Sequence, residues 1–150
     1  MTADSEVRAY AERLPVPEFE TTAWTVPPAL TDATITIVTT AALHVAGHEA
    51  FSAADTGFRV IPAAARDLVL GHWSPNFDRL GFAADHNVVF PIDRLDELAE
   101  AGTIGRVAPR HIAFAGNQDD TVAKVRIDSG PAAAAMLRGD GVDIALLTPV

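Results

Sequence analysis

The stretch Thr34-Ile-Thr-Ile-Val-Thr-Thr40 is β-branched throughout. Such residues suit the pleated surface of a sheet, so we expect a buried strand that opens after Thr31-Asp32 and ends at Thr39-Thr40. A second stretch, Val142-Asp-Ile-Ala-Leu-Leu-Thr148, is a near-continuous apolar run. Runs of this kind occur where helices cover both faces of a parallel sheet. Together the two stretches predict an α/β fold with a mostly parallel sheet.

Other segments alternate between strand and helix patterns. Short apolar runs bounded by turn residues predict strands at 58–62, 67–71 and 107–114. Pro91 and Gly102 bracket a run with helical spacing, so residues 92–101 are predicted to be a helix. The four alanines within 129–138 predict another helix, which ends near Gly139. The alternation favours a three-layer α/β sandwich of the Rossmann or flavodoxin type.

The first 33 residues differ from the rest of the chain. Residues 4–13 mix helix formers with charge and predict a short surface helix. Four prolines make residues 14–30 extended and irregular, and Trp24 is the expected anchor of this arm. We therefore divide the chain into a helix and proline-rich arm at 1–33 and an α/β domain at 34–150.

Composition narrows the class of protein. Twenty acidic against eleven basic residues give a net charge of -9, which disfavours nucleic acid and anionic membrane surfaces as partners. The chain has no cysteine, which excludes disulfides and thiolate metal sites within it. Its N-terminus has no apolar signal core, and no apolar run is long enough to span a membrane. A cytoplasmic location is expected.

Polar groups gather after three of the expected strands, at 39–44, 71–79 and 148–150. Ligands of open α/β sheets bind at such strand ends, and the three should lie close together if the strands are parallel neighbours. His72 has the strongest functional case, because an imidazole at a strand end can bind an anion or move a proton. Turn formation alone would explain Asn76, Asp85 and Asn87. His44 and His48 are four apart, but no helix is expected there, so no metal site is predicted.

Six segments read together resemble the selenoprotein B family, the component B subunits of glycine, sarcosine, betaine and D-proline reductases. The resemblance runs in order from about residue 34 to the end. The segments are Val38-Thr-Thr-Ala-Ala-Leu-His44, Phe58-Arg-Val-Ile-Pro62, His72-Trp-Ser-Pro-Asn-Phe-Asp-Arg79, Asp85-His-Asn-Val-Val-Phe-Pro-Ile-Asp-Arg94, Ala108-Pro-Arg-His-Ile-Ala-Phe-Ala-Gly116 and Asp140-Gly-Val-Asp-Ile-Ala-Leu-Leu-Thr-Pro149.

The resemblance implies reductive cleavage of a C–N bond by a redox pair of cysteine or selenocysteine residues. In the family that pair directly follows the segment matching Leu147-Thr-Pro-Val150, so the catalytic residue is expected just after Val150 and none within the chain. An in-frame UGA codon would account for this, and the α/β domain would then be incomplete at its C-terminus. An apolar closing strand without a covering helix should expose apolar surface and favour a partner or self-association.

Position in the sequence nominates eight residues to line a substrate site: His44, His72, Asn76, Asp78, Arg79, Arg94, Arg110 and His111. Arg79, Arg94 or Arg110 could hold the carboxylate of a small amino-acid-derived substrate through a bidentate pair. The resemblance implies other reductase subunits and a thioredoxin-like electron donor as partners, and no prosthetic group or metal is expected here. A non-catalytic binding or assembly module is the alternative. A third interpretation is a hydrolase that uses His72 and Asp78.

Overall fold

A five-stranded sheet forms the centre of the computed structural model, in which residues 3–13, 18, 20–73, 79–116, 118 and 122–150 are described. Strand β1 (Thr34–Thr39) lies in its middle and is parallel to β5 (Arg106–Val107), β6 (Arg110–Phe114) and β7 (Ile144–Thr148). Strand β3 (Phe58–Pro62) runs antiparallel to β6. The mostly parallel sheet predicted from the two apolar stretches is confirmed.

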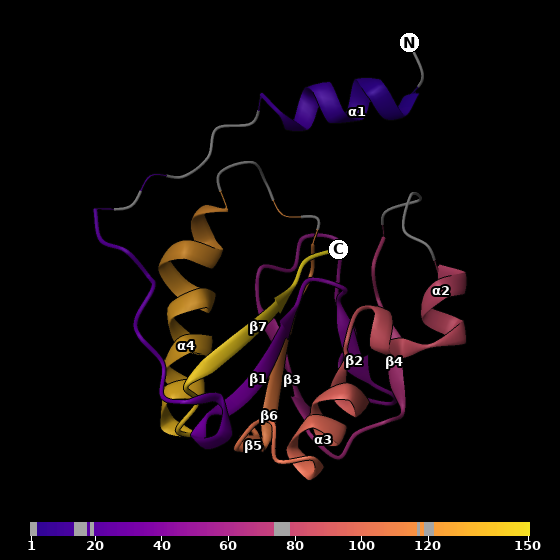
Figure 1. The fold of residues 1–150 in the computed structure, drawn as a ribbon. Helices are drawn as coiled ribbons and strands as arrows, with labels where there is room; N and C mark the ends of the chain where they lie inside the picture. Colours follow the sequence, from indigo (N-terminus) through magenta and orange to yellow (C-terminus); the bar gives the residue numbers. More distant parts are fainter. Residues whose placement is uncertain (1–2, 14–17, 19, 74–78, 117, 119–121) are drawn as a thin grey trace.

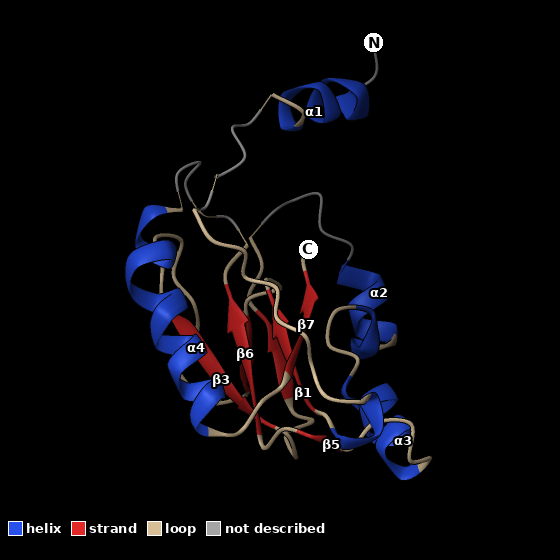
Figure 2. Ribbon diagram, turned by 60° about the vertical axis from the view of Figure 1, so that its left-hand side comes forward, coloured by secondary structure: helices blue, strands red, loops and turns tan. Residues whose placement is uncertain are grey.

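Helices cover both faces of this sheet (Figure 2). On one face, α4 (Gly130–Gly139) follows the π-helical turn η3 (Val125–Ser129), and its Ala133 and Leu137 pack on Ile112 of β6. On the other face lie α2 (Arg79–Ala84), the short turn η2 (His86–Val88) and α3 (Ile92–Glu100). Ile92 and Leu95 of α3 join the larger core cluster beside β1. The α/β sandwich is confirmed.

The predicted helix at 92–101 shows why its boundaries could be read from the sequence. Pro91 precedes the helix, and its fixed φ suits a helix start. Gly102 follows with φ of 68°, a left-handed conformation that glycine adopts without steric cost. Its N–H donates to the carbonyl of Ala99, which completes the last turn.

The strand predicted at 67–71 is present as β4 (Leu68–Leu70), but its expected place as a parallel neighbour is wrong. It pairs antiparallel with β2 (Leu43–Val45) in a separate two-stranded sheet (Figure 1). Residues 46–67, which separate β2 from β4, contain β3, and β3 pairs with β6 in the main sheet. Strand β4 is therefore not a neighbour of the parallel strands.

The N-terminal helix is confirmed as α1 (Ala3–Ala11). Residues 20–29 contain no helix or strand and lead into the short turn η1 (Leu30–Asp32). Trp24, the expected anchor of the arm, lines a groove beside β7, and 76% of the residue is exposed. No helix in the described part of the chain is long and apolar enough to cross a bilayer.

Candidate functional site at the carboxyl edge of the sheet

The parallel strands β1, β6 and β7 end at the same edge of the sheet, and hydrogen bonds join the segments that follow them. The hydroxyl of Thr39 donates to the carbonyl of Thr148 at 3.2 Å. The main-chain N–H of Val150 donates to the hydroxyl oxygen of Thr40 at 2.8 Å. Ala41 and Ala115 form an isolated antiparallel bridge, which connects the residue after β6 to the segment after β1. We call this region the carboxyl edge.

Three segments of the carboxyl edge come close to one another at Gly116. A Cβ atom at this position would lie 2.9 Å from the carbonyl oxygens of Thr40 and Val150 and 3.1 Å from Nε2 of His72. Real side chains do not tolerate contacts under 3.0 Å to backbone atoms, so the close approach requires glycine. The predicted convergence of the three strand ends is therefore confirmed, with His72 among them.

His72 reaches this edge from the loop after β4. The N–H of Gly71 donates to the carbonyl of Ala42 at 3.1 Å, and this bond holds the loop against the end of β1. Ala42 has φ of 54°, a left-handed conformation that is costly for a residue with a side chain. The turn after β1 thus carries local strain at the point where it meets the His72 loop.

The His72 imidazole is buried, with only 7% of the residue exposed. Burial lowers the pKa of His72 because it disfavours the charged form. A hydrogen bond to the main-chain carbonyl of Val150 opposes this shift, and the positive charge of Arg79 adds to it. The net effect is a pKa of His72 below its ordinary value, so folding favours the neutral form of the imidazole.

Two more of the nominated residues lie near His72. Arg79, the first residue of α2, donates from Nη2 to the carbonyl oxygen of His72 at 2.5 Å. His44 of β2 is also buried, and its Nδ1 lies 3.6 Å from the point where a Cβ of Gly71 would stand. Nδ1 of His44 has no hydrogen-bond partner among the described residues. Asn76 and Asp78 lie outside the described residues.

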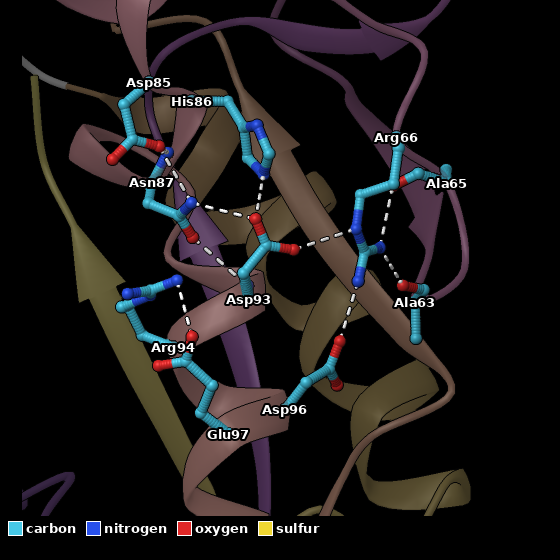
Figure 3. A network of polar contacts seen from close by, with 10 residues as sticks. All are labelled: Ala63, Ala65, Arg66, Asp85, His86, Asn87, Asp93, Arg94, Asp96 and Glu97. Carbon is cyan, nitrogen blue, oxygen red and sulfur yellow. Dashed lines mark hydrogen bonds and ion pairs between the residues drawn. The ribbon is translucent and has the colours of Figure 1, made fainter.

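Arg94 is not brought to the carboxyl edge. It forms an exposed ion pair with Glu97 one turn along α3, at 2.7 Å. Figure 3 shows it beside a larger polar network around Asp93. There Asn87 donates to the carboxylates of Asp85 and Asp93 at 2.8 and 2.9 Å.

The network around Asp93 stabilises the start of α3. The N–H of Asp93 donates to the side-chain oxygen of Asn87, and Arg66 donates to its carboxylate at 3.0 Å. The hydrogen bond from Asn87, followed by the charges of His86 and Arg66, holds the pKa of Asp93 below its usual value. Asp85 caps the turn η2 by accepting from the N–H of Asn87, which confirms the interpretation of these two residues as turn formers.

Arg110 and His111 lie at the start of β6, toward the opposite edge of the sheet. Arg110 forms a two-point ion pair with Asp140 at the end of α4. His111 is fully buried, and its Nδ1 accepts from the N–H of Ile37 at 3.0 Å. Burial lowers the pKa of His111 to about 4. In the structure these two residues contact other parts of the sheet and α4, and are not brought together with His72.

Thr40 and Gly116 belong to the carboxyl edge, although sequence reasoning did not nominate them. Thr40 ends one expected strand and Gly116 lies two residues after another, and that position was the available signal. The groups that meet here are a buried neutral imidazole, a hydroxyl and main-chain amides. Such a set can transfer a proton and hold a polar ligand by hydrogen bonds. Among the described residues, no group of three His, Asp or Glu side chains is arranged to hold a metal ion.

The fold and this edge define an α/β domain with a buried imidazole beside the carboxyl ends of its parallel strands. The chain is similar to the D-proline reductase subunit gamma of Acetoanaerobium sticklandii, with 36% identity over 146 residues. The match covers 95% of this chain and 59% of that protein, so the chain spans about three fifths of its relative's length. No family model matches the chain. No solved structure matches it either. The relationship to a proline reductase subunit confirms the resemblance to reductases at this coarser level.

Proposed function

We propose that the chain is a subunit of a reductase that cleaves a C–N bond in D-proline or a related compound such as glycine, sarcosine or betaine. The observation that carries this proposal is the 36% identity to a D-proline reductase subunit across 95% of the chain. Fold alone would not support it, since α/β sandwiches host many chemistries.

The geometry of the carboxyl edge is consistent with the proposal that a redox residue acts beside Val150. The resemblance puts the redox cysteine or selenocysteine directly after the segment matching Leu147-Thr-Pro-Val150. The main chain of Val150 is hydrogen-bonded to Thr40 and lies against Gly116 and His72. A residue that followed Val150 would emerge among these groups.

Substrate binding is assigned to the side chains near His72. We propose that His44, His72 and Arg79 line the site together with Asn76 and Asp78. Of the three nominated arginines, Arg94 lies on α3 and Arg110 at the start of β6, and neither is brought to His72. Arg79 is therefore the arginine proposed to hold a substrate carboxylate, because it lies beside His72.

The outer side of β7 supports contact with other reductase subunits or a thioredoxin-like donor. Leu147 is 67% exposed, and Leu146 on the opposite face of the strand is 37% exposed. The groove between β7 and the arm at 23–27 has a volume of about 430 Å³ and is lined by Trp24, Ile144 and Leu147. These exposed leucines support the proposal that a partner or a second copy covers this strand.

The second candidate is a non-catalytic binding or assembly module, which the absence of cysteine favours. Alkylation separates the two candidates. The natively expressed protein is treated with a thiol- and selenol-directed probe, and its molecular mass is measured by mass spectrometry. Labelling of a longer product supports the reductase, whereas an unlabelled product of 15.8 kDa supports the module. The codon after Val150 adds a direct check, because UAA or UAG would contradict the UGA hypothesis.

The released amine identifies the substrate. Cleavage of a ring C–N bond in proline converts a secondary amine into a primary amine on the same molecule. Cleavage of glycine, sarcosine or betaine instead releases ammonia, methylamine or trimethylamine. The native complex is supplied with each compound and a dithiol, and the products are analysed by mass spectrometry. If no compound is cleaved, the proposed function is wrong.

A further inference from the structure

Strand β7 has an open outer edge. Among the described strands it pairs with β1 alone, on the side of β1 opposite β5 and β6 (Figure 1). The carbonyl of Thr148 accepts from the N–H of Thr40, so the main chain of Thr148 faces β1. Main-chain groups alternate in direction along a strand, so Ala145 and Leu147 point their N–H and C=O groups away from β1. None of these outward groups has a hydrogen-bond partner among the described residues.

The proline-rich arm does not pair with this edge. Its described residues 20–29 contain no strand, and none of their main-chain groups is hydrogen-bonded to β7. A groove of about 430 Å³ lies between the arm and the strand. Ala145 and Leu147 line it on the strand side, and Trp24 and Pro27 line it on the arm side. The open edge therefore faces a groove with an exposed indole beside it.

The residues of β7 do not protect the edge from pairing. Natural edge strands are protected by charged side chains, by proline or by bulges. Residues 144–148 contain neither charge nor proline, and all five pair with β1 without a bulge. Leu147 is also largely exposed. An apolar edge of this kind is a template for pairing with another strand.

We propose that β7 of a second copy of the chain pairs antiparallel with this edge, about a two-fold axis beside Leu146. In this register Ala145 lies opposite the partner's Leu147, and Leu146 lies opposite the partner's Leu146. Opposite residues of alternate antiparallel pairs exchange both of their hydrogen bonds. Each pair of Ala145 with Leu147 is of this kind, so every outward group of both strands is satisfied and the two sheets become one.

The sequence of β7 and one internal hydrogen bond select this register. With the axis beside Leu147, Ala145 would lie opposite Pro149, which has no N–H to donate. With the axis beside Ala145, Leu147 would lie opposite Asp143, whose N–H already donates to a carbonyl of β1. The proposed axis is the one that gives each outward group a free partner.

Charge and interface size favour a second copy as the occupant. The chain carries a net charge of -9, so two copies repel each other wherever carboxylates meet. Residues 144–150 contain no charged side chain, so two copies can meet here without opposing carboxylates. The paired strands, with Trp24 and Leu147 of both copies, would bury on the order of 1,000 Å², the lower limit for a specific interface. A two-fold pair also uses the same surface on both copies.

This proposal specifies the coverage of β7 that the proposed function includes, and it rests on the proposed function in that respect alone. Since the chain has no cysteine, single cysteines test the register. Leu146 lies in a non-hydrogen-bonded pair, whose Cα atoms are about 4.5 Å apart and within disulfide reach. Leu146→Cys should therefore form a covalent dimer of twice 15.8 kDa under mild oxidation.

Ala145→Cys is the matched control for the cross-link. In the proposed register the Ala145 residues of the two copies lie diagonally, more than about 7 Å apart and beyond disulfide reach. Both variants are oxidised at the same concentration, and the products are separated without reductant. Equal yields of covalent dimer from the two variants, or no dimer from a folded Leu146→Cys, would overturn the proposal.

Hydrogen exchange of the wild-type chain covers the case in which Leu146→Cys does not fold. The amides of Ala145 and Leu147 are open in the monomer and bonded in the dimer. When about nine tenths of the chain is dimeric, they should exchange about tenfold more slowly than in dilute solution. The amides of Leu146 and Thr148 face β1 and should be protected at every concentration. Fast exchange of Ala145 and Leu147 throughout the concentration series would overturn the proposal.

A different occupant, or failure of the proposed function, gives a different result. If other reductase subunits protect Ala145 and Leu147 but concentration does not, the second-copy pairing is wrong. The cross-link is measured without substrate and so does not depend on turnover. A covalent dimer without amine release supports the β7 pair and contradicts the reductase function. Amine release without the dimer supports the reductase function and contradicts the β7 pair.

Discussion

His111 Nδ1 accepts a hydrogen bond from the main-chain N–H of Ile37 at 3.0 Å, and this bond closes a gap in the central sheet. Strand β1 pairs with β5 through Thr34 and Ile35 and with β6 through Val38 and Thr39. Between them Ala108-Pro109 interrupts the partner strand. The imidazole satisfies the buried N–H of Ile37, which would otherwise lack a partner at a cost of roughly 1–3 kcal/mol.

The pKa of His111 predicts a pH-dependent stability. Its pKa falls from 6.5 to about 4 on folding, so between these values the unfolded chain binds more protons than the folded one. The contribution is fully present above pH 6.5 and is lost as the pH falls toward 4. The full loss amounts to about 3 kcal/mol by linkage. Urea unfolding at a series of pH values between 4 and 8 measures this slope.

His111→Asn supplies the comparison, because an amide oxygen can accept the Ile37 N–H without titrating. We expect this variant to be less stable than the wild type at pH 7 and to show a smaller slope between pH 4 and 6.5. His48→Gln should keep the wild-type slope. Equal slopes in His111→Asn and the wild type would show that other groups govern acid unfolding.

Gly116→Ala should destabilise the protein, because its Cβ would lie 2.9 Å from two carbonyl oxygens. Forcing such a group into a packed site typically costs about 1–3 kcal/mol. For a chain of this size, each kcal/mol lowers the melting temperature by about 2–4 °C. Gly139→Ala is the control, since nothing lies within 4 Å of its Cβ position. A melting temperature of Gly116→Ala equal to that of Gly139→Ala would refute the close approach.

Leu147→Lys should weaken association without unfolding the domain. Leu147 is 67% exposed on β7, so a charge there costs little in the isolated chain but is unfavourable inside an apolar interface. Sedimentation velocity at several concentrations, with and without the partner subunits, measures the effect. Leu98→Lys on α3, where 39% of the residue is exposed, is the control. Association that resists Leu147→Lys but is lost in Leu98→Lys would place the interface elsewhere.

Arg110→Lys should lower the melting temperature slightly, because lysine cannot bind both carboxylate oxygens of Asp140 in the fork geometry of arginine. The effect should shrink in 1 M salt, since Arg110 is partly exposed and salt screens such pairs. Arg94→Lys, in the exposed pair with Glu97, should melt like the wild type. An Arg110→Lys melting curve identical to that of Arg94→Lys would mean that the two-point pair adds no stability.

The sequence alone determined the helices and strands that depend on residues close together in the chain. The β-branched run at 34–40, the helix bounded by Pro91 and Gly102, and the apolar strand at 142–148 all form where they were predicted. It also indicated that the segments after three strands would meet, although β4, which leads to His72, is not one of the parallel strands on which that expectation depended. His72 was identified as the strongest candidate because it stands at a strand end.

Only the tertiary structure decided which strands pair and what each polar side chain contacts. Strand β3 pairs antiparallel with β6 and β4 pairs antiparallel with β2, so the place of each strand depends on a partner distant in sequence. His72 and His111 are both buried. One lies at the carboxyl edge and the other bridges a gap in the sheet. The local sequence could not distinguish the roles of these two histidines, because each role depends on the neighbours that folding brings to the side chain.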